Sequence, residues 1–204
     1  MKLRPNRLRG FYSVLDEPSS SLALALLRHS KVMQVRKKPS TPMELRAIGR
    51  VARAMTARLG ALFVVNDDIE LAHHLGADAV HLGQDDTPLT TARRRTDLIL
   101  GVSTHNLEQL RAALGDGADY VAFGPVFATS TKANPDPTVG LDALREAAKL
   151  AGAVPLVAIG GITPGNAPSV RAAGADAACV ISAVNRARSV SAAANSIARA
   201  FQTT

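Results

Sequence analysis

The chain has no tryptophan, and aromatic residues make up only 3% of its 204 residues. Proteins that bind single-stranded nucleic acids stack the bases on aromatic side chains, and the sequence shows no zinc-finger or RNA-recognition signature. A nucleic-acid partner is therefore a poor explanation for the formal net charge of +7. An anionic small molecule is the better explanation for this excess of Lys and Arg.

Cysteine is nearly absent as well, because Cys179 is the single one. It cannot form an internal disulfide, which points to the reducing cytoplasm. No apolar run reaches about 18 residues, the length that suggests a transmembrane helix. The basic segment 1–9 is not followed by the apolar stretch of a secretory signal. We expect one cytoplasmic domain over residues 1–204, with residues 1–9 as a basic tail and no membrane partner.

Short apolar segments alternate with helical segments along the whole chain. We predict eight strands, at Phe11–Leu15, Val32–Arg36, Leu62–Val65, Ala79–Leu82, Leu98–Val102, Tyr120–Phe123, Leu156–Ile159 and Ala178–Ile181. Eight successive βα units favour a closed (β/α)8 TIM barrel. An open doubly wound sheet is the alternative, but the first strand ends in Asp16-Glu17-Pro18 rather than in a glycine-rich phosphate turn.

The connections between these strands carry helix signals. Thr-Pro pairs at 41–42, 87–88 and 163–164 predict an N-cap followed by proline at the first helical position. Glu44 adds a capping box to the first pair. Left-handed helix ends are predicted at Gly60, Gly76, Gly115 and Gly174. The tripeptide Gly-Ala-Asp precedes strands at 76–78, 117–119 and 174–176, as expected of a recurring βα unit.

Acidic residues follow two consecutive predicted strands. The chain reads Asn66-Asp67-Asp68 after the third strand and Gly83-Gln84-Asp85-Asp86 after the fourth. A TIM barrel brings such strand ends together at one rim, and two adjacent carboxylates repel each other unless a cation lies between them. We therefore predict that Asp67 and Asp86 hold Mg²⁺, completed by substrate phosphates. Asp68 and Asp85 are better explained as helix caps or supporting groups, and the opposite rim is bland.

Basic residues lie next to this acidic pair. Gln34, Arg36 and Lys38 alternate along the second strand, so they share one face, and such side chains suit a polyphosphate. Asn66 can donate its amide to a phosphate oxygen. The long loop Ala128–Pro137 contains Lys132 and is predicted to cover an anionic substrate as a lid.

A second anion site is predicted after the last two strands. Gly160-Gly161 and Ile181-Ser182 stand where barrels bind a phosphate monoester through backbone N–H groups. Of the histidines, His105 is the better functional candidate, whereas His73 and His74 are expected on the surface. Two anion sites together indicate a reaction between a diphosphate ester and a monophosphate.

Taken together, these segments resemble the thiamine-phosphate synthase family. The matching stretches run in the family's order from about residue 32 to 185: Gln34–Lys38, Asn66–Asp68, Val80–Asp86, Gly101–His105, Gly124–Phe127, Thr129–Lys132, Ile159–Ile162 and Val180–Ala183. The resemblance implies a TIM-barrel transferase that uses Mg²⁺. It joins hydroxymethylpyrimidine diphosphate to thiazole phosphate and releases thiamine phosphate and pyrophosphate.

The resemblance also implies a role for each matching residue. Asp67 and Asp86 are the metal ligands. The diphosphate is held, and its departure assisted, by Arg36, Lys38 and Lys132, together with Asn66. The aminopyrimidine contacts Gln34 and Ser103. The thiazole phosphate is received by Thr129, Thr131, Gly161, Ile181 and Ser182. One departure from the family pattern is Lys37, where an acidic residue is common.

Two other functions are weighed beside this one. A thiazole tautomerase-like paralogue would rely on His105, but such paralogues typically lose the metal carboxylates and the Thr-x-Thr-Lys loop. A non-catalytic barrel would bind phosphate ligands without turnover. The oligomeric state stays open, a homodimer included.

Overall fold

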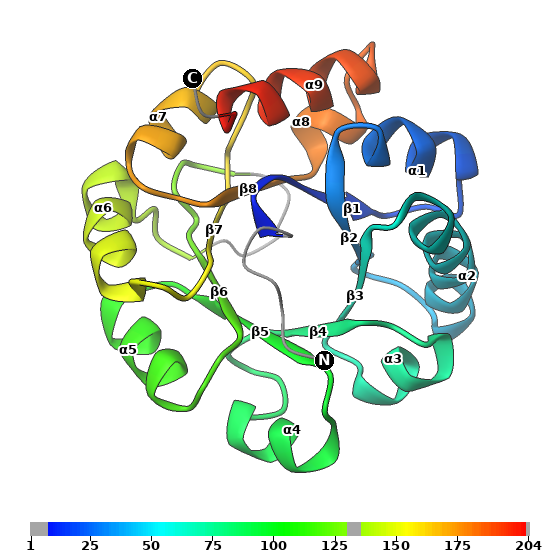
Figure 1. The fold of residues 1–204 in the computed structure, drawn as a ribbon, viewed down its shortest axis with the longest axis horizontal. Coiled ribbons are helices and arrows are strands. Elements are labelled where there is room, and N and C mark those ends of the chain that lie inside the picture. The colour runs from blue at the N-terminus through cyan, green and yellow to red at the C-terminus, as the bar shows by residue number, and fades with distance from the viewer. Residues whose placement is uncertain (1–7, 130–135, 203–204) are drawn as a thin grey trace.

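The computed structural model describes residues 8–129 and 136–202. In this part of the chain, eight parallel strands close into a barrel in the order β1 to β8, with helices outside the ring (Figure 1). The strands are β1 Gly10–Leu15, β2 Ser30–Val35, β3 Leu62–Asn66, β4 Ala79–Leu82, β5 Ile99–Thr104, β6 Tyr120–Phe123, β7 Leu156–Ile159 and β8 Ala177–Val180. The predicted TIM barrel is confirmed.

The helices follow the strands in sequence. They are α1 Ser20–Leu27, α2 Pro42–Leu59, α3 Ile69–Leu75, α4 Leu89–Arg95, α5 Leu107–Gly115, α6 Gly140–Ala151, α7 Ala167–Ala172, α8 Ser182–Asn185 and α9 Val190–Ala200. None of the helices in the described ranges combines the length and the hydropathy that crossing a membrane requires.

Two apolar clusters hold the barrel together. The larger one fills the space between sheet and helices, with Met33 and Val35 of β2 among its members. The smaller one fills the barrel interior and includes Tyr12, Val32 and Tyr120. Because successive side chains of a strand point to opposite faces, Gln34 shares the inner face with Val32, as the alternation predicts.

The repeated Gly-Ala-Asp connectors fix the register at the amino-terminal rim. Asp78 donates its backbone N–H to Phe63 O over 2.9 Å, and its carboxylate accepts the Phe63 N–H over 2.9 Å. The same two-way bond joins Asp119 to Leu100 and Asp176 to Leu156. We term these three pairs of hydrogen bonds the aspartate clamps. We expected the connectors at this rim to carry no specific side-chain interactions. Instead, their aspartate side chains accept hydrogen bonds from strand N–H groups that would otherwise lack partners.

Three predicted helix ends differ from the structure. Thr41 and Glu44 form the predicted capping box, but Pro88 occupies the N-cap of α4 without a side-chain bond. The helix predicted to start at Thr163 begins at Ala167 instead, because Asn166 Oδ1 accepts the Thr163 N–H and closes a turn first. Gly115 belongs to α5, and the left-handed residue there is Gly117, with φ of 81°.

Candidate active site

A cavity of about 570 Å³ opens at the carboxyl ends of the strands. Most predicted site residues line it: Gln34, Arg36, Lys38, Asn66, Asp67, Asp86, Ser103, Thr129, Gly161, Ile181 and Ser182. The two others, Thr131 and Lys132, lie outside the described residues, as does most of the predicted lid. Sequence positions from 34 to 182 thus converge on one cavity.

The acidic pair lies at the rim beside β3 and β4. Asp67 adopts a left-handed backbone, with φ of 63°, which Asp tolerates better than most residues. Its N–H donates to His81 O over 2.8 Å. Asp86 turns back on its own loop, where its Oδ2 accepts the Gly83 N–H over 2.7 Å. Burial, followed by the nearby Asp86, raises the pKa of Asp67 to about 6. The direction of the shift reflects the burial of Asp67 first and the nearness of the second carboxylate next.

Cationic side chains approach the pair from the segment after β2. Lys38 Nζ lies 2.6 Å from Asp67 Oδ2, while the lysine side chain itself stays largely exposed. Arg36 and Lys38 follow β2 rather than belonging to it, because the strand ends at Val35. Lys37 points away from the cavity and pairs with Glu44, its Nζ lying 2.6 Å from Oε1. Lys37, the residue that departs from the family pattern, is therefore not part of the cavity wall.

Gln34 occupies a buried position in the cavity wall, with 4% of its surface exposed. Within the described residues, its Nε2 is one of two buried side-chain polar atoms that lack a hydrogen-bond partner, the other being Asn185 Oδ1. A buried amide without a partner is unfavourable. The group is therefore available to a ligand that brings an acceptor into the cavity.

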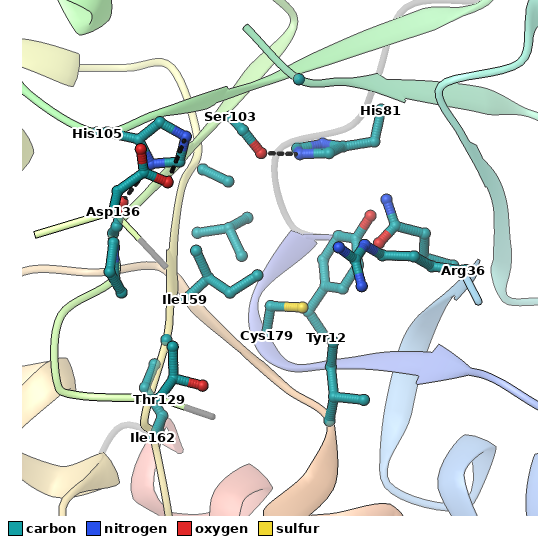
Figure 2. Close-up of a pocket in the computed structure, with 18 of the residues that line it drawn as sticks. Tyr12, Arg36, His81, Ser103, His105, Thr129, Asp136, Ile159, Ile162 and Cys179 are labelled. Carbon is teal, nitrogen blue, oxygen red and sulfur yellow. Dashed lines mark hydrogen bonds and ion pairs between the residues drawn. The ribbon is translucent and has the colours of Figure 1, made fainter. Parts of the chain in front are cut away.

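A line of hydrogen bonds crosses the floor of the cavity. Tyr12 Oη lies 3.1 Å from Tyr120 Oη, which lies 3.0 Å from His81 Nδ1, and His81 Nε2 lies 2.8 Å from Ser103 Oγ. Figure 2 shows the hydrogen bond between Ser103 and His81, with Tyr12 among the other residues that line the pocket. Burial, with a smaller contribution from Arg36, lowers the pKa of His81 to about 4, so its ring is neutral at pH 7.

Gly101 makes this line of bonds geometrically feasible. It pairs with His81 on one side and with Tyr120 on the other. A Cβ on Gly101 would lie 2.0 Å from Tyr120 Cζ, so only glycine lets the tyrosine ring lie across β5 to reach the histidine. The sequence pattern did not reveal this network, although Tyr12 and Tyr120, the chain's two tyrosines, both fall within predicted strands.

His105 connects the end of β5 to the loop after β6. Its Nδ1 donates to Gly124 O over 2.6 Å, because a carbonyl can only accept. Its Nε2 lies 3.6 Å from Asp136 Oδ2, a pairing drawn in Figure 2. Both His105 and Asp136 line the cavity. The structure therefore places His105 at the mouth, as predicted, while His73 and His74 are exposed on α3.

The segments after β6 and β7 pack closely against each other. Phe127 N–H donates to Gly160 O over 3.1 Å. Gly161 has φ of 62°, and a Cβ there would lie 2.4 Å from Ala128 O. Glycine is required at this position by both conformation and space. The backbone of Gly161 thereby lies on the same cavity wall as Ile181 and Ser182, where the short helix α8 begins.

These features define a TIM-barrel protein with a polar pocket at the carboxyl ends of its strands, where a pair of carboxylates meets a lysine. Residues 13–184 match the family model TMP-TENI, described as thiamine monophosphate synthase. The chain therefore belongs to the thiamine monophosphate synthase family.

Similar proteins carry the same name. The thiamine-phosphate synthase of Anaeromyxobacter dehalogenans is 43% identical over 204 residues, covering 98% of this chain and 90% of that protein. That of Methanoregula boonei is 49% identical over 154 residues, covering 74% and 71%. The solved thiamine phosphate pyrophosphorylase of Pyrococcus furiosus has a TM-score of 0.87 at 33% identity and covers 97% of this chain and 96% of that one.

Proposed function

We propose that this chain joins 4-amino-2-methyl-5-hydroxymethylpyrimidine diphosphate to thiazole phosphate, giving thiamine monophosphate and pyrophosphate in the cytoplasm. Family membership supports the reaction. The observation that carries its assignment to this cavity is the pair Asp67 and Asp86, with Lys38 Nζ 2.6 Å from Asp67 Oδ2. Such a mixed cluster suits a diphosphate that arrives with a divalent cation.

The acidic pair fits Mg²⁺ on its chemistry. Hard carboxylate oxygens are the ligands that Mg²⁺ prefers, and the ion commonly uses one or two of them together with substrate phosphates. In the described part of the chain, no group of three or more His, Cys, Asp or Glu side chains forms a metal cluster. Asp67 and Asp86 would hold the ion, and its charge would neutralise the departing diphosphate.

The remaining polar residues support cleavage of the bond between the pyrimidine methylene and the diphosphate. In the proposed dissociative substitution, the C–O electron pair leaves with the diphosphate, and the aminopyrimidine delocalises the cation that remains. Arg36, Lys38 and Lys132 hold the leaving anion together with Asn66. Preorganised charges of this kind often make the largest contribution to catalysis. Gln34 Nε2 and Ser103 contact the aminopyrimidine.

The thiazole phosphate is assigned to the opposite wall. Thr129, Thr131, Gly161, Ile181 and Ser182 would receive its phosphate and hold the thiazole nitrogen near the methylene carbon. That nitrogen carries a lone pair, so no general base is needed to activate it. Holding both partners in one cavity can contribute about 7 kcal/mol or more to lowering the barrier.

Pyrophosphate release tests the proposal. Purified protein is mixed with both substrates and Mg²⁺, and released pyrophosphate is measured by a coupled assay. We expect release that depends on both substrates and stops with excess chelator. Absence of pyrophosphate and of thiamine phosphate would exclude the synthase activity.

A double variant tests the metal assignment. Asp67→Asn with Asp86→Asn keeps the side-chain shapes and removes both charges, and Asn suits the left-handed backbone at position 67. We expect loss of activity with an unchanged circular dichroism spectrum. The matched control is Asp68→Asn, one residue away, where Asp68 caps α3 by accepting the Leu71 N–H and Asn caps equally well. Full activity of the double variant would refute the assignment.

The same assay separates the alternatives. A thiazole tautomerase would convert thiazole isomers through His105 and release no pyrophosphate, and a non-catalytic barrel would bind ligands without turnover. The proposal requires only the two small-molecule substrates, with no nucleic acid or membrane. A homodimer is tested separately, by the mass of the protein in solution.

A further inference from the structure

A chain of buried side-chain hydrogen bonds leads to Ser103. It passes from β1 through β6 and β4 to β5, by way of Tyr12, Tyr120, His81 and Ser103. Tyr12 and Tyr120 are 2% and 1% exposed, and His81 is 8% exposed. All four residues line the cavity, and Ser103 is the partly exposed member of the line. We call Tyr12, Tyr120 and His81 the interior relay.

Hydrogen atoms can be counted along this line. Each of the three hydroxyls has one hydrogen, and the neutral His81 ring has one N–H. Three contacts use three of these four hydrogens, so one hydrogen remains free. The tautomer of His81 divides the possible arrangements into two kinds, which differ in the residue that keeps the free hydrogen.

In one direction, Ser103 donates to His81 Nε2, His81 Nδ1–H donates to Tyr120, and Tyr120 donates to Tyr12. The free hydrogen is then on Tyr12, or on Tyr120 if Tyr12 donates to Tyr120 instead, and both side chains are buried. In the other direction, Tyr12 donates to Tyr120, Tyr120 donates to His81 Nδ1, and His81 Nε2–H donates to Ser103 Oγ. The free hydrogen is then on Ser103, at the cavity surface. The second direction is favoured, because a buried donor without an acceptor is costly.

Gln84 restrains the same residue from outside. Its Nε2 donates to the Ser103 backbone carbonyl over 2.6 Å. In this direction the Ser103 side chain accepts from His81, while its backbone carbonyl is held by the loop that follows β4. A hydroxyl whose oxygen already accepts one hydrogen bond has its own hydrogen directed away from that donor.

We propose that the interior relay positions Ser103 as a hydrogen-bond donor toward a ring nitrogen of the aminopyrimidine. This inference rests on the proposed function for the identity of the ring. Tyr12, Tyr120 and His81 are positioning residues, since they act through Ser103. The relay thereby selects a heteroaromatic ring with an acceptor nitrogen over an isosteric ring that has C–H there.

The His81 tautomer gives the first test, and it needs neither substrate nor metal. Long-range ¹H–¹⁵N spectra of the labelled full chain report which ring nitrogen carries hydrogen, and the spectrum of His81→Asn assigns the signal. We expect hydrogen on Nε2 and a bare Nδ1. Hydrogen on Nδ1 would overturn the proposed direction.

A double-mutant cycle gives the second test. Tyr120→Phe removes one relay hydroxyl, and we expect kcat/KM for the pyrimidine substrate to fall by about tenfold, the equivalent of one lost hydrogen bond. If the relay acts through Ser103, the same change in a Ser103→Ala background should alter kcat/KM by less than about twofold. An equal loss in both backgrounds would show a purely structural role for Tyr120 and overturn the proposal.

Thr104→Val is the matched control. Thr104 follows Ser103 on β5 and is as buried as Tyr120, each with 1% of its surface exposed. It donates its hydroxyl to Ala122 O over 2.9 Å, outside the relay. The substitution should lower stability without changing kcat/KM in either background. Failure of the proposed function would appear differently, as wild-type protein that releases no pyrophosphate, and the tautomer measurement would still decide the direction of the relay.

Discussion

A single methyl group placed on Gly101 should disrupt the centre of the barrel. A Cβ built there lies 2.0 Å from Tyr120 Cζ and 2.3 Å and 2.5 Å from Cε1 and Cε2. Carbon atoms in contact prefer about 3.5–4.0 Å, so the ring of Tyr120 must move by about 1.5 Å. That ring is 1% exposed and is held by hydrogen bonds to Tyr12 and His81, so a shift of this size disturbs both its packing and its hydrogen bonds.

The expected cost can be worked out from the contacts. Forcing a methyl group into a packed core costs about 1–3 kcal/mol. Displacing Tyr120 also breaks its bonds to Tyr12 and His81, each worth about 1 kcal/mol. We expect Gly101→Ala to lower the free energy of unfolding by about 3–5 kcal/mol. In a chain of this size, that corresponds to a fall in Tm of about 10 °C.

Urea denaturation followed by circular dichroism measures this loss. Gly115→Ala is the control, because Gly115 lies in α5 with no atom within 4 Å of its added Cβ, and alanine there should leave stability unchanged or slightly higher. Tyr120→Ala supplies the decisive background, since Gly101→Ala should cost less than about 1 kcal/mol once the ring is gone. An equal cost with and without the ring would refute the steric explanation.

Three further outcomes are expected. Gly161→Ala should raise the KM for thiazole phosphate by at least about tenfold, because the new Cβ would lie 2.4 Å from Ala128 O. Steady-state kinetics measure this change. Gly165→Ala is the control, because its Cβ would make only an ordinary contact at 3.8 Å. Asp78→Ala should lower the free energy of unfolding by about 1–3 kcal/mol by leaving the Phe63 N–H unsatisfied. Asp78→Asn, which keeps an acceptor, should lose less in the same urea titration. The pKa of His81 falls from 6.5 to about 4 on folding, so the folded protein binds fewer protons than the unfolded chain between these values. Stability should therefore be complete above pH 6.5 and should fall by about 3 kcal/mol as the pH drops to 4. The pKa of Asp67 is raised to about 6, so this carboxyl changes stability with pH in the opposite sense. The effect of His81 is therefore measured as the difference in unfolding free energy between wild type and His81→Asn at each pH. If that difference stays constant from pH 6.5 to 4, the prediction is wrong.

The barrel was predictable because its signals are local. Apolar strands followed by polar ends recur eight times, and each can be found within about ten residues of sequence. Strand ends shifted by one or two residues, as at Arg36, because burial patterns do not mark the last hydrogen bond of a ladder. Thr163 shows the limit of capping rules, since a competing turn with Asn166 delays the helix.

Side-chain partnerships across the barrel were not predictable from the same patterns. Tyr12 and Tyr120 are 108 residues apart, and nothing near either one indicates the other. The contact depends on strand register and on the missing side chain of Gly101, which are properties of the closed sheet. The acidic pair was found because both carboxylates follow adjacent strands directly, so chain order alone brings them together.

The aspartate clamps have a consequence for how the barrel is divided. They join β3 to β4, β5 to β6 and β7 to β8, and at the same place in the first pair Ser30 Oγ donates to Phe11 O over 2.7 Å. These side-chain bonds thus fall within four strand pairs, while backbone hydrogen bonds continue across the boundaries between the pairs. A chain severed after α2, α4 or α6 keeps every aspartate clamp inside one fragment, so we expect fragments cut there to reassemble better than fragments cut within a strand pair.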